Sequence, residues 1–196
     1  MHKMEAVSIV LATLALAVSV VTAWLTLFRR GTLRATQPTM IFFGSEADGI
    51  HQKVFLRMLL YSTGRRGQLI ENMFLKVRHG ESVQNLNVWA YGEREQLVRG
   101  NGLFVPENGI ALNHHFLPPE GTKVEFLAGE YVVETCASLV GKATSLILNK
   151  VVLTVDSQQA DSIKAGDGLF FDWGPDSRRY HPHVMKKPEL RIPGLR

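Results

Sequence analysis

Cysteine is almost absent from this chain of 196 residues, which contains only Cys136. No intrachain disulfide can form, so cysteine usage does not argue for an oxidising compartment, and it does not argue against one. C-x-x-C pairs are absent as well. The usual cysteine-based zinc and redox sites are therefore not expected.

Familiar catalytic motifs are also missing. The chain has no G-x-S-x-G elbow and no H-E-x-x-H helix. Gly141-Lys142 resembles part of a phosphate-binding loop, but Cys136 stands where that loop needs glycine, and Ala143 stands where it needs Ser or Thr. We interpret this stretch as a tight hairpin turn. The prediction is a non-enzymatic protein without cofactor or bound metal.

Histidines offer the one route to a metal site. His181 and His183 alternate, so in an extended chain they face the same way. They lie just after Asp172 and Asp176 in the sequence, which could supply a carboxylate ligand. His114 and His115 are adjacent on a predicted strand and face opposite ways, which leaves at most one of them for any site. Solvated loop histidines are the favoured interpretation, and a metal-dependent enzyme is the weakest of our hypotheses.

Charge, proline and glycine are all absent from one long stretch, residues 6–28. As a helix it is about 34 Å long, enough to cross a hydrocarbon core of about 30 Å. Signal-peptide cores are shorter, about 7–15 residues, and this run ends at Leu27-Phe28-Arg29-Arg30 instead of a cleavage site. The sequence predicts an uncleaved membrane anchor over residues 1–28.

Small side chains recur along one face of this anchor at spacings of four and three residues. They are Ser8, Ala12, Ala15, Ser19, Thr22 and Thr26. Such a period lets a second helix approach closely along a gently supercoiled seam. The stripe predicts self-association, or docking on a helix of another membrane protein.

Positive charge exceeds negative charge, with a formal net charge of +4. Much of the excess flanks the anchor or lies at the C-terminus, at Arg29, Arg30, Arg34, Lys186, Lys187, Arg191 and Arg196. Basic residues in these places suit an anionic lipid surface better than a nucleic acid. Three arginines follow the anchor whereas Lys3 precedes it, which favours a cytoplasmic over a periplasmic domain at a bacterial-type inner membrane.

The rest of the chain reads as one β-rich domain over residues 38–183, after a basic linker (29–37) and before a basic disordered tail (184–196). Extended runs are predicted at 39–43, 53–62, 69–78, 83–91, 100–105, 110–117, 130–139, 146–155 and 168–173, and a short helix at 156–164. Short strands with almost no helix predict an all-β antiparallel sandwich. Its organisation resembles immunoglobulin-like domains, without their cysteine pair.

One hairpin is specified best, with Arg78 opposite Val83, Leu75 opposite Leu86 and Met73 opposite Val88 on the apolar face. The other face carries Lys76, Arg78, Trp89 and Tyr91. If that face is open, these residues form an aromatic and basic contact patch. The alternative is that both faces are covered, which would make Trp89 part of the core.

The segment 170–183 combines aromatic, acidic, basic and histidine side chains. Trp173, Arg178, Arg179 and Tyr180 are candidate binding residues, because aromatics and arginine dominate binding hot spots. The favoured interpretation is a structural lid, in which Phe170, Phe171 and Trp173 close one end of the sandwich, and the two roles are compatible.

These patterns favour a single-pass membrane protein that acts as a non-enzymatic interaction or accessory module. Its expected partners are the lipid bilayer and a membrane protein or a second copy of the chain. A sensor that binds a small polar ligand is the alternative.

Overall fold

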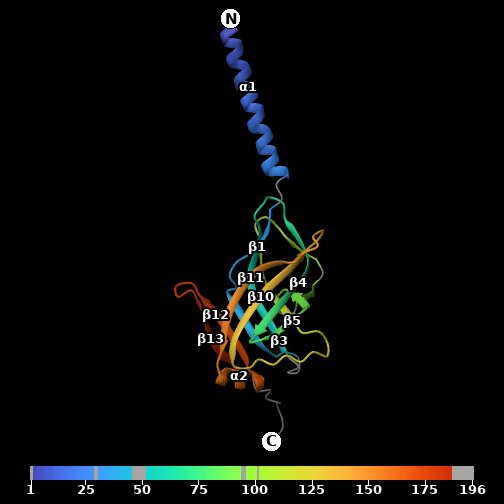
Figure 1. The fold of residues 1–196 in the computed structure, drawn as a ribbon, viewed down its shortest axis with the longest axis vertical. Helices are drawn as coiled ribbons and strands as arrows, with labels where there is room; N and C mark the ends of the chain where they lie inside the picture. Colours follow the sequence, from blue (N-terminus) through green and yellow to red (C-terminus); the bar gives the residue numbers. More distant parts are fainter. Residues whose placement is uncertain (1, 29–30, 46–51, 94–95, 101, 187–196) are drawn as a thin grey trace.

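A computed structural model describes residues 2–28, 31–45, 52–93, 96–100 and 102–186 of the chain. One long helix stands apart from a β-rich domain (Figure 1). The helix comprises α1 (His2–Ala23) and a final π-helical turn, η1 (Trp24–Phe28). Arg29, Arg30, Lys187, Arg191 and Arg196, which the sequence marks as basic flanks, lie outside the described residues.

The domain contains thirteen strands and one short helix among its described residues. In chain order they are β1 (Leu33–Ala35), β2 (Met40–Ser45), β3 (Gln52–Ser62), β4 (Gln68–His79), β5 (Ser82–Leu86), β6 (Val88–Tyr91), β7 (Val98–Arg99), β8 (Leu103–Val105), β9 (Ile110–Leu117), β10 (Gly129–Leu139), β11 (Leu146–Val155), α2 (Ser157–Lys164), β12 (Gly168–Gly174) and β13 (Arg179–Met185).

The strands form two antiparallel sheets. The eight-stranded sheet has the order β13-β12-β2-β3-β9-β6-β7, with β1 also pairing with β3. The five-stranded sheet has the order β11-β10-β4-β5, with β8 also pairing with β4. The predicted all-β antiparallel class is therefore confirmed. The immunoglobulin-like organisation is not, because eight and five strands differ from the four-plus-three arrangement of that fold.

The inner faces of both sheets share one hydrophobic core, centred on Phe43 of β2. Its ring stacks on Phe126 at 4.6 Å between centroids and meets the edges of Tyr131 and Phe171 at 5.6 and 5.4 Å. Tyr131 lies on β10 of the small sheet, whereas Phe43 and Phe171 lie on the large sheet. This aromatic cluster holds the two sheets together.

The helix is long and apolar enough to cross a membrane. Met4–Thr26 has a mean hydropathy of 2.4, and none of it is buried against the rest of the protein. The packing of the domain makes no use of these apolar side chains. The length and hydropathy of this helix fit the membrane span that the sequence predicts.

The predicted hairpin is right for half of its length. β4 and β5 pair with Arg78 opposite Val83 and Leu75 opposite Leu86. The predicted pair of Met73 with Val88 is wrong, because the chain leaves the small sheet at Asn87 and β6 joins β9 in the large sheet. Leu86 of β5 and Trp89 of β6 both point into the core although they are three residues apart. The inward and outward alternation of side chains therefore shifts by one residue at this crossover.

A bulge corrects a second expectation. Alternation along residues 146–155 predicts that Ile147 faces inward with Val151, Leu153 and Val155, but Ile147 is 61% exposed while those three are buried. The pairing of β10 with β11 shifts register between Thr135 and Cys136, so one extra residue of β11 turns Ile147 outward.

The folded part extends past the limits expected from sequence. β1 lies within the predicted linker and pairs with β3, and β13 continues to Met185. The predicted helix at 156–164 is present as α2. Asp156 caps it, accepting from the Gln159 backbone N–H at 2.8 Å while the Gln159 side chain accepts from the Asp156 N–H.

Trp89 is a core residue. It is 2% exposed on the inner face of β6, and its Nε1 donates to Nδ1 of His114 at 3.2 Å. His114 is fully buried, and its Nε2 has no partner among the described residues. Burial, with a smaller contribution from His115, lowers the pKa of His114 to about 3. His114 therefore stays neutral in the folded protein.

Replacing Trp89 with Ala should destabilise the domain by about 3–5 kcal/mol, because it empties a fully packed site. The apparent melting temperature should fall by roughly 10 °C or more. Cys136, the only cysteine and 1% exposed, provides the measurement, since a thiol-reactive fluorophore labels it only on unfolding. Val83→Ala, at an exposed position, is the control. A shift of W89A no larger than that of the control would contradict the placement of Trp89 in the core.

Stability should fall as the pH drops below about 6.5. Unfolded His114 binds a proton there, while folded His114 does so only near pH 3, so its contribution is complete above pH 6.5 and is lost as the pH falls towards 3. Between pH 7.5 and 5.0 this one histidine should cost about 2 kcal/mol. Urea unfolding of the full chain in detergent should show a smaller pH-dependent loss for His114→Gln. The exposed control His181→Gln should behave as wild type, and identical pH profiles for all three proteins would refute this origin.

Candidate functional site

Two sheet edges end on the same side of the domain and leave a groove between them. β11 is the last strand of the small sheet, and β13 is the last strand of the large sheet. The β12–β13 hairpin projects sideways beside β11 (Figure 1). The groove between them has a volume of about 480 Å³. We call it the edge groove.

Residues 150–154 of β11 line one side of the edge groove. The other side consists of Phe171, Trp173, Arg178, Arg179, Tyr180 and Pro182 from the β12–β13 hairpin, with Gln37 between the two sides. Because β11 pairs with β10 on one side only among the described residues, alternate backbone N–H and C=O groups on its other side point into this region.

Tyr180 and Gln37 hold the groove open at a fixed width. The Tyr180 hydroxyl donates to the Pro38 carbonyl at 2.8 Å and accepts from Gln37 Nε2 at 3.1 Å. Asn149 Nδ2 of β11 completes the bridge by donating to Gln37 Oε1 at 3.4 Å. Burial raises the pKa of Tyr180, so the hydroxyl keeps its proton and these bonds persist. The groove is thus preformed.

The groove is positively charged. Arg178 and Arg179 are exposed and form no ion pair among the described residues, while Lys150 pairs with Glu134 at 3.3 Å. Arg178 has a φ of 51°, which is uncommon for a residue other than glycine. Glycine adopts such a φ without strain, so an arginine at this position carries a backbone cost.

The structure brings together one predicted set of binding residues and separates the other. Trp173, Arg178, Arg179 and Tyr180 all line the edge groove, and the Trp173 and Tyr180 rings lie 5.1 Å apart. The predicted patch of Lys76, Arg78, Trp89 and Tyr91 does not form. Lys76 and Arg78 are exposed on the small sheet, whereas Trp89 is buried and Tyr91 half-buried on the inner face of the large sheet.

The segment 170–183 is a strand hairpin rather than a lid. Phe171 is buried in the core, as the lid interpretation requires, but Phe170 lies on the outer face of the large sheet. The turn between the strands is held by Ser177, whose hydroxyl donates to the Gly174 carbonyl at 3.3 Å and lies 2.9 Å from His181 Nε2. Trp173 remains half-buried in the groove wall.

The histidines do not gather into a metal site in the described part of the chain, where no group of three or more His, Cys, Asp or Glu side chains has suitable spacing. His183 Nδ1 instead contacts Asp172 Oδ2 at 3.1 Å. His183 and His115 are the two ends of a row of five rings in contact across five strands of the outer face, with Phe170, Phe42 and Phe55 between them.

The small residues of the anchor lie on an exposed helix, as expected. The hydroxyls of Ser8, Ser19, Thr22 and Thr26 each donate to the carbonyl four residues earlier, at 2.8–3.0 Å. These hydroxyls can still accept a bond from a neighbouring helix, but close packing is the larger part of what the stripe offers. The association itself stays a prediction.

Sequence reasoning missed two features of this region. β13 was not predicted because Pro182 suggests a loop, although an edge strand tolerates proline. The free edge of β11 was not predicted because alternation in a sequence does not tell which strand lies at the edge of a sheet. The pattern of Trp173, Arg178 and Tyr180 in one hairpin was the available signal.

Comparisons with models of known protein families, with curated proteins and with solved structures give no match. Function is therefore argued from the edge groove and the anchor.

Proposed function

We propose that this protein is a membrane-anchored, non-enzymatic interaction module that binds an extended acidic segment of a partner protein in the edge groove. One observation carries the proposal: the free edge of β11 runs beside an aromatic pair and three cationic side chains. An extended segment adds to a free strand edge through main-chain hydrogen bonds, and neighbouring pockets select its side chains.

The chemistry of the groove defines the partner segment. Arg178 and Arg179 lack partners among the described residues and suit carboxylates, which a guanidinium binds in a bidentate manner. Trp173 and Tyr180 offer apolar surface beside them. A segment of about five residues that alternates acidic and apolar side chains fits this arrangement.

The partner is expected in the same membrane. The anchor confines the domain to the bilayer surface, and the small-residue stripe provides a seam for a second membrane helix or a second copy. An accessory subunit combines the two contacts, one in the bilayer and one in the groove.

Reversing the groove charge should weaken peptide binding. We suggest selecting acidic-apolar peptides from a random library on the full chain in nanodiscs, then measuring affinity by fluorescence anisotropy. Arg178→Glu with Arg179→Glu should weaken binding at least about tenfold, because each lost charge-assisted bond contributes about 1.5–3 kcal/mol. Arg178→Gly should weaken binding while keeping or raising the melting temperature, since glycine relieves the backbone at φ 51°.

The matched control is Lys76→Glu with Arg78→Glu, the same charge change on the exposed face of the small sheet. It should bind the selected peptides like wild type. An equal loss in this control would mean that the groove is not the site. Failure to select any alternating acidic peptide would contradict the proposal directly.

A small-ligand sensor is the second candidate, favoured by the size of the groove. About 480 Å³ lies within the range of about 300–1,000 Å³ typical of small-molecule sites. A small polar anion between Arg178, Arg179 and Trp173 would use the same charges. Quenching of Trp173 fluorescence by a panel of small carboxylates and phosphates, lost in Trp173→Phe, separates this function from peptide binding.

We also propose that the domain lies on the cytoplasmic side of the membrane. Arg29, Arg30 and Arg34 follow the span closely, whereas Lys3 is the sole Lys or Arg before it. The more basic flank stays cytoplasmic.

Reporter fusions after Arg196 test the side. A green fluorescent protein fusion should fluoresce and an alkaline phosphatase fusion should be inactive, since that phosphatase requires the periplasm. Replacing the three arginines by Ala and adding three lysines before Glu5 should reverse both readouts. An active phosphatase on the unaltered chain would refute the cytoplasmic placement.

A further inference from the structure

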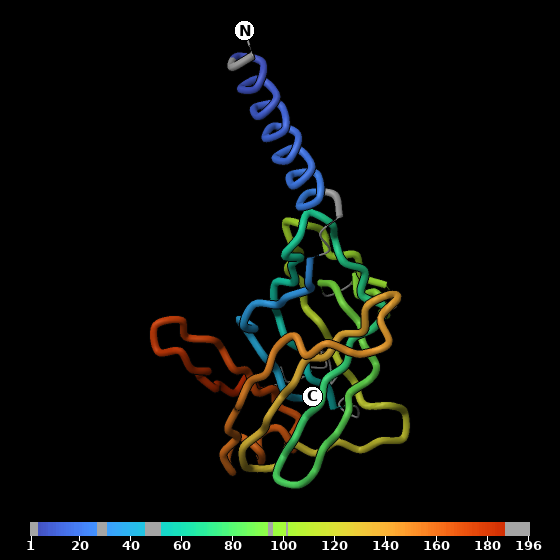
Figure 2. Tube along the Cα trace, turned by 45° about the horizontal axis from the view of Figure 1, so that its top comes forward, coloured from blue at the N-terminus to red at the C-terminus, as the bar shows by residue number. Residues whose placement is uncertain are grey.

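The turn between β3 and β4, residues 63–67, forms the end of the domain nearest the anchor, as both views of the chain show (Figures 1 and 2). The chain that leaves the helix is bound to this turn. Thr32 N–H donates to Thr63 Oγ1 at 2.8 Å, and Thr63 N–H donates back to the Thr32 carbonyl at 3.0 Å. Gln68 Nε2 donates to the Gly31 carbonyl at 3.1 Å.

Glycines make this attachment close. A Cβ at Gly31 would lie 2.2 Å from the backbone nitrogen of Gly64. The two backbones therefore approach too closely for any side chain at position 31. The connector from Gly31 onward is therefore part of the folded domain. Only two residues, Arg29 and Arg30, separate it from the last helical residue, Phe28.

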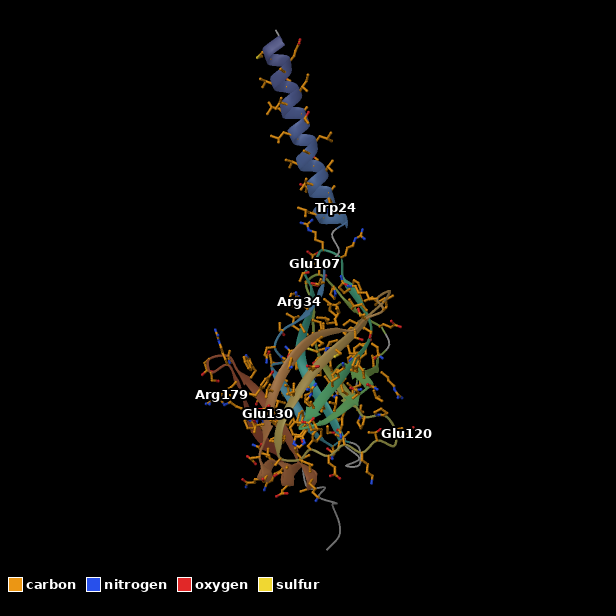
Figure 3. The ribbon with its side chains drawn as sticks, viewed as in Figure 1. Trp24, Arg34, Glu107, Glu120, Glu130 and Arg179 are labelled. Atoms are coloured by element: carbon orange, nitrogen blue, oxygen red, sulfur yellow. The ribbon has the colours of Figure 1, made fainter. Side chains whose placement is uncertain are left out.

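The short connector fixes the depth of the turn relative to the bilayer. Three residue steps from Phe28 to Gly31 span at most about 10 Å. The headgroup layer is about 5–8 Å thick on each side of the hydrocarbon core. Trp24 lies at the domain end of the helix, where tryptophan marks the membrane interface (Figure 3). The turn must therefore lie at or just outside the headgroups, whichever side of the membrane the domain occupies.

The side chains at this end suit such a place. Arg65 and Arg66 are exposed, and no ion pair holds either of them among the described residues. Lys142 is exposed in the β10–β11 turn. Glu107 (Figure 3) and the exposed Glu71 of β4 carry opposing charge. The balance of these five side chains is positive.

Beside the two arginines runs a row of exposed apolar side chains. Leu69 pairs with Phe104 across β4 and β8, and the Val140 N–H donates to the Leu69 carbonyl. They are 44%, 59% and 55% exposed. The Phe104 ring lies against Gly67 of the turn, where a Cβ would be 2.4 Å from its Cζ. A basic turn with an exposed phenylalanine at headgroup depth is the chemistry of an interfacial lipid contact.

We propose that this membrane-proximal tip, consisting of residues 63–67 with Leu69, Phe104 and Val140, docks on the headgroups of acidic phospholipids. Arg65 and Arg66 bind lipid phosphates, and Phe104 enters the interface beside them. The contact is independent of the edge groove. It orients the domain on the bilayer in addition to the covalent tether.

Hydrogen exchange of the full chain in nanodiscs tests the contact. Amides of residues 62–69 should exchange at least about fivefold more slowly with 30% phosphatidylglycerol than with pure phosphatidylcholine, the factor that corresponds to one basic residue at an acidic surface. Arg65→Glu with Arg66→Glu should remove this slowing. Arg178→Glu with Arg179→Glu, the same change on the β12–β13 hairpin, should leave it intact.

Two checks keep the outcome decisive. Burial of Cys136 reports whether the arginine variants fold, and the milder Arg65→Gln with Arg66→Gln replaces the double glutamate if they do not. Equal exchange in both kinds of nanodisc would overturn the role of acidic lipid. Equal slowing by inorganic phosphate in detergent would assign the arginines to a free anion and likewise overturn the proposal.

Discussion

Packing of two sheets face to face is the constraint on which the rest of this domain depends. With one cysteine, and no metal-ligand cluster in the described residues, neither a disulfide nor a clustered metal site supplements that burial. The ring of Phe43 contacts Phe126, Tyr131 and Phe171 at the centre, so both sheets must keep their inner faces in register. A single register slip would turn these rings to solvent.

The surface features follow from how unequal the two sheets are. Eight strands cannot be covered by five, so the β12–β13 hairpin of the large sheet stands beside the end of the small sheet instead of beneath it. The edge groove is the space that this mismatch leaves. In the described part of the chain, no second sheet covers the outer face of the large sheet. Its phenylalanines Phe42, Phe55 and Phe170 instead cover one another in a row of ring contacts that ends at a histidine on each side.

Features set by neighbouring residues could be predicted well from the sequence. Which of the two sheets a strand joins could not. The long apolar helix, the cap at Asp156 and the pairing of Arg78 with Val83 depend on neighbouring residues, and the sequence specifies each of them. The crossover at Asn87 depends on which sheet has room for β6, a tertiary matter. Trp89 consequently appears as surface in a hairpin pattern and as core in the structure. For the candidate site, the hairpin residues could be identified from composition, but their neighbour β11 required the sheet order.

The anchor changes what affinity the edge groove needs. A single free strand edge with two or three cations forms few contacts, and interfaces of that size bind weakly in solution. Two proteins confined to one bilayer meet at a far higher effective concentration, so a weak contact suffices once a second contact holds them together. The β12–β13 hairpin projects from the side of the domain while the helix leaves from its end (Figure 1). A partner held in the same bilayer, as proposed above, would reach the hairpin from the side of the domain.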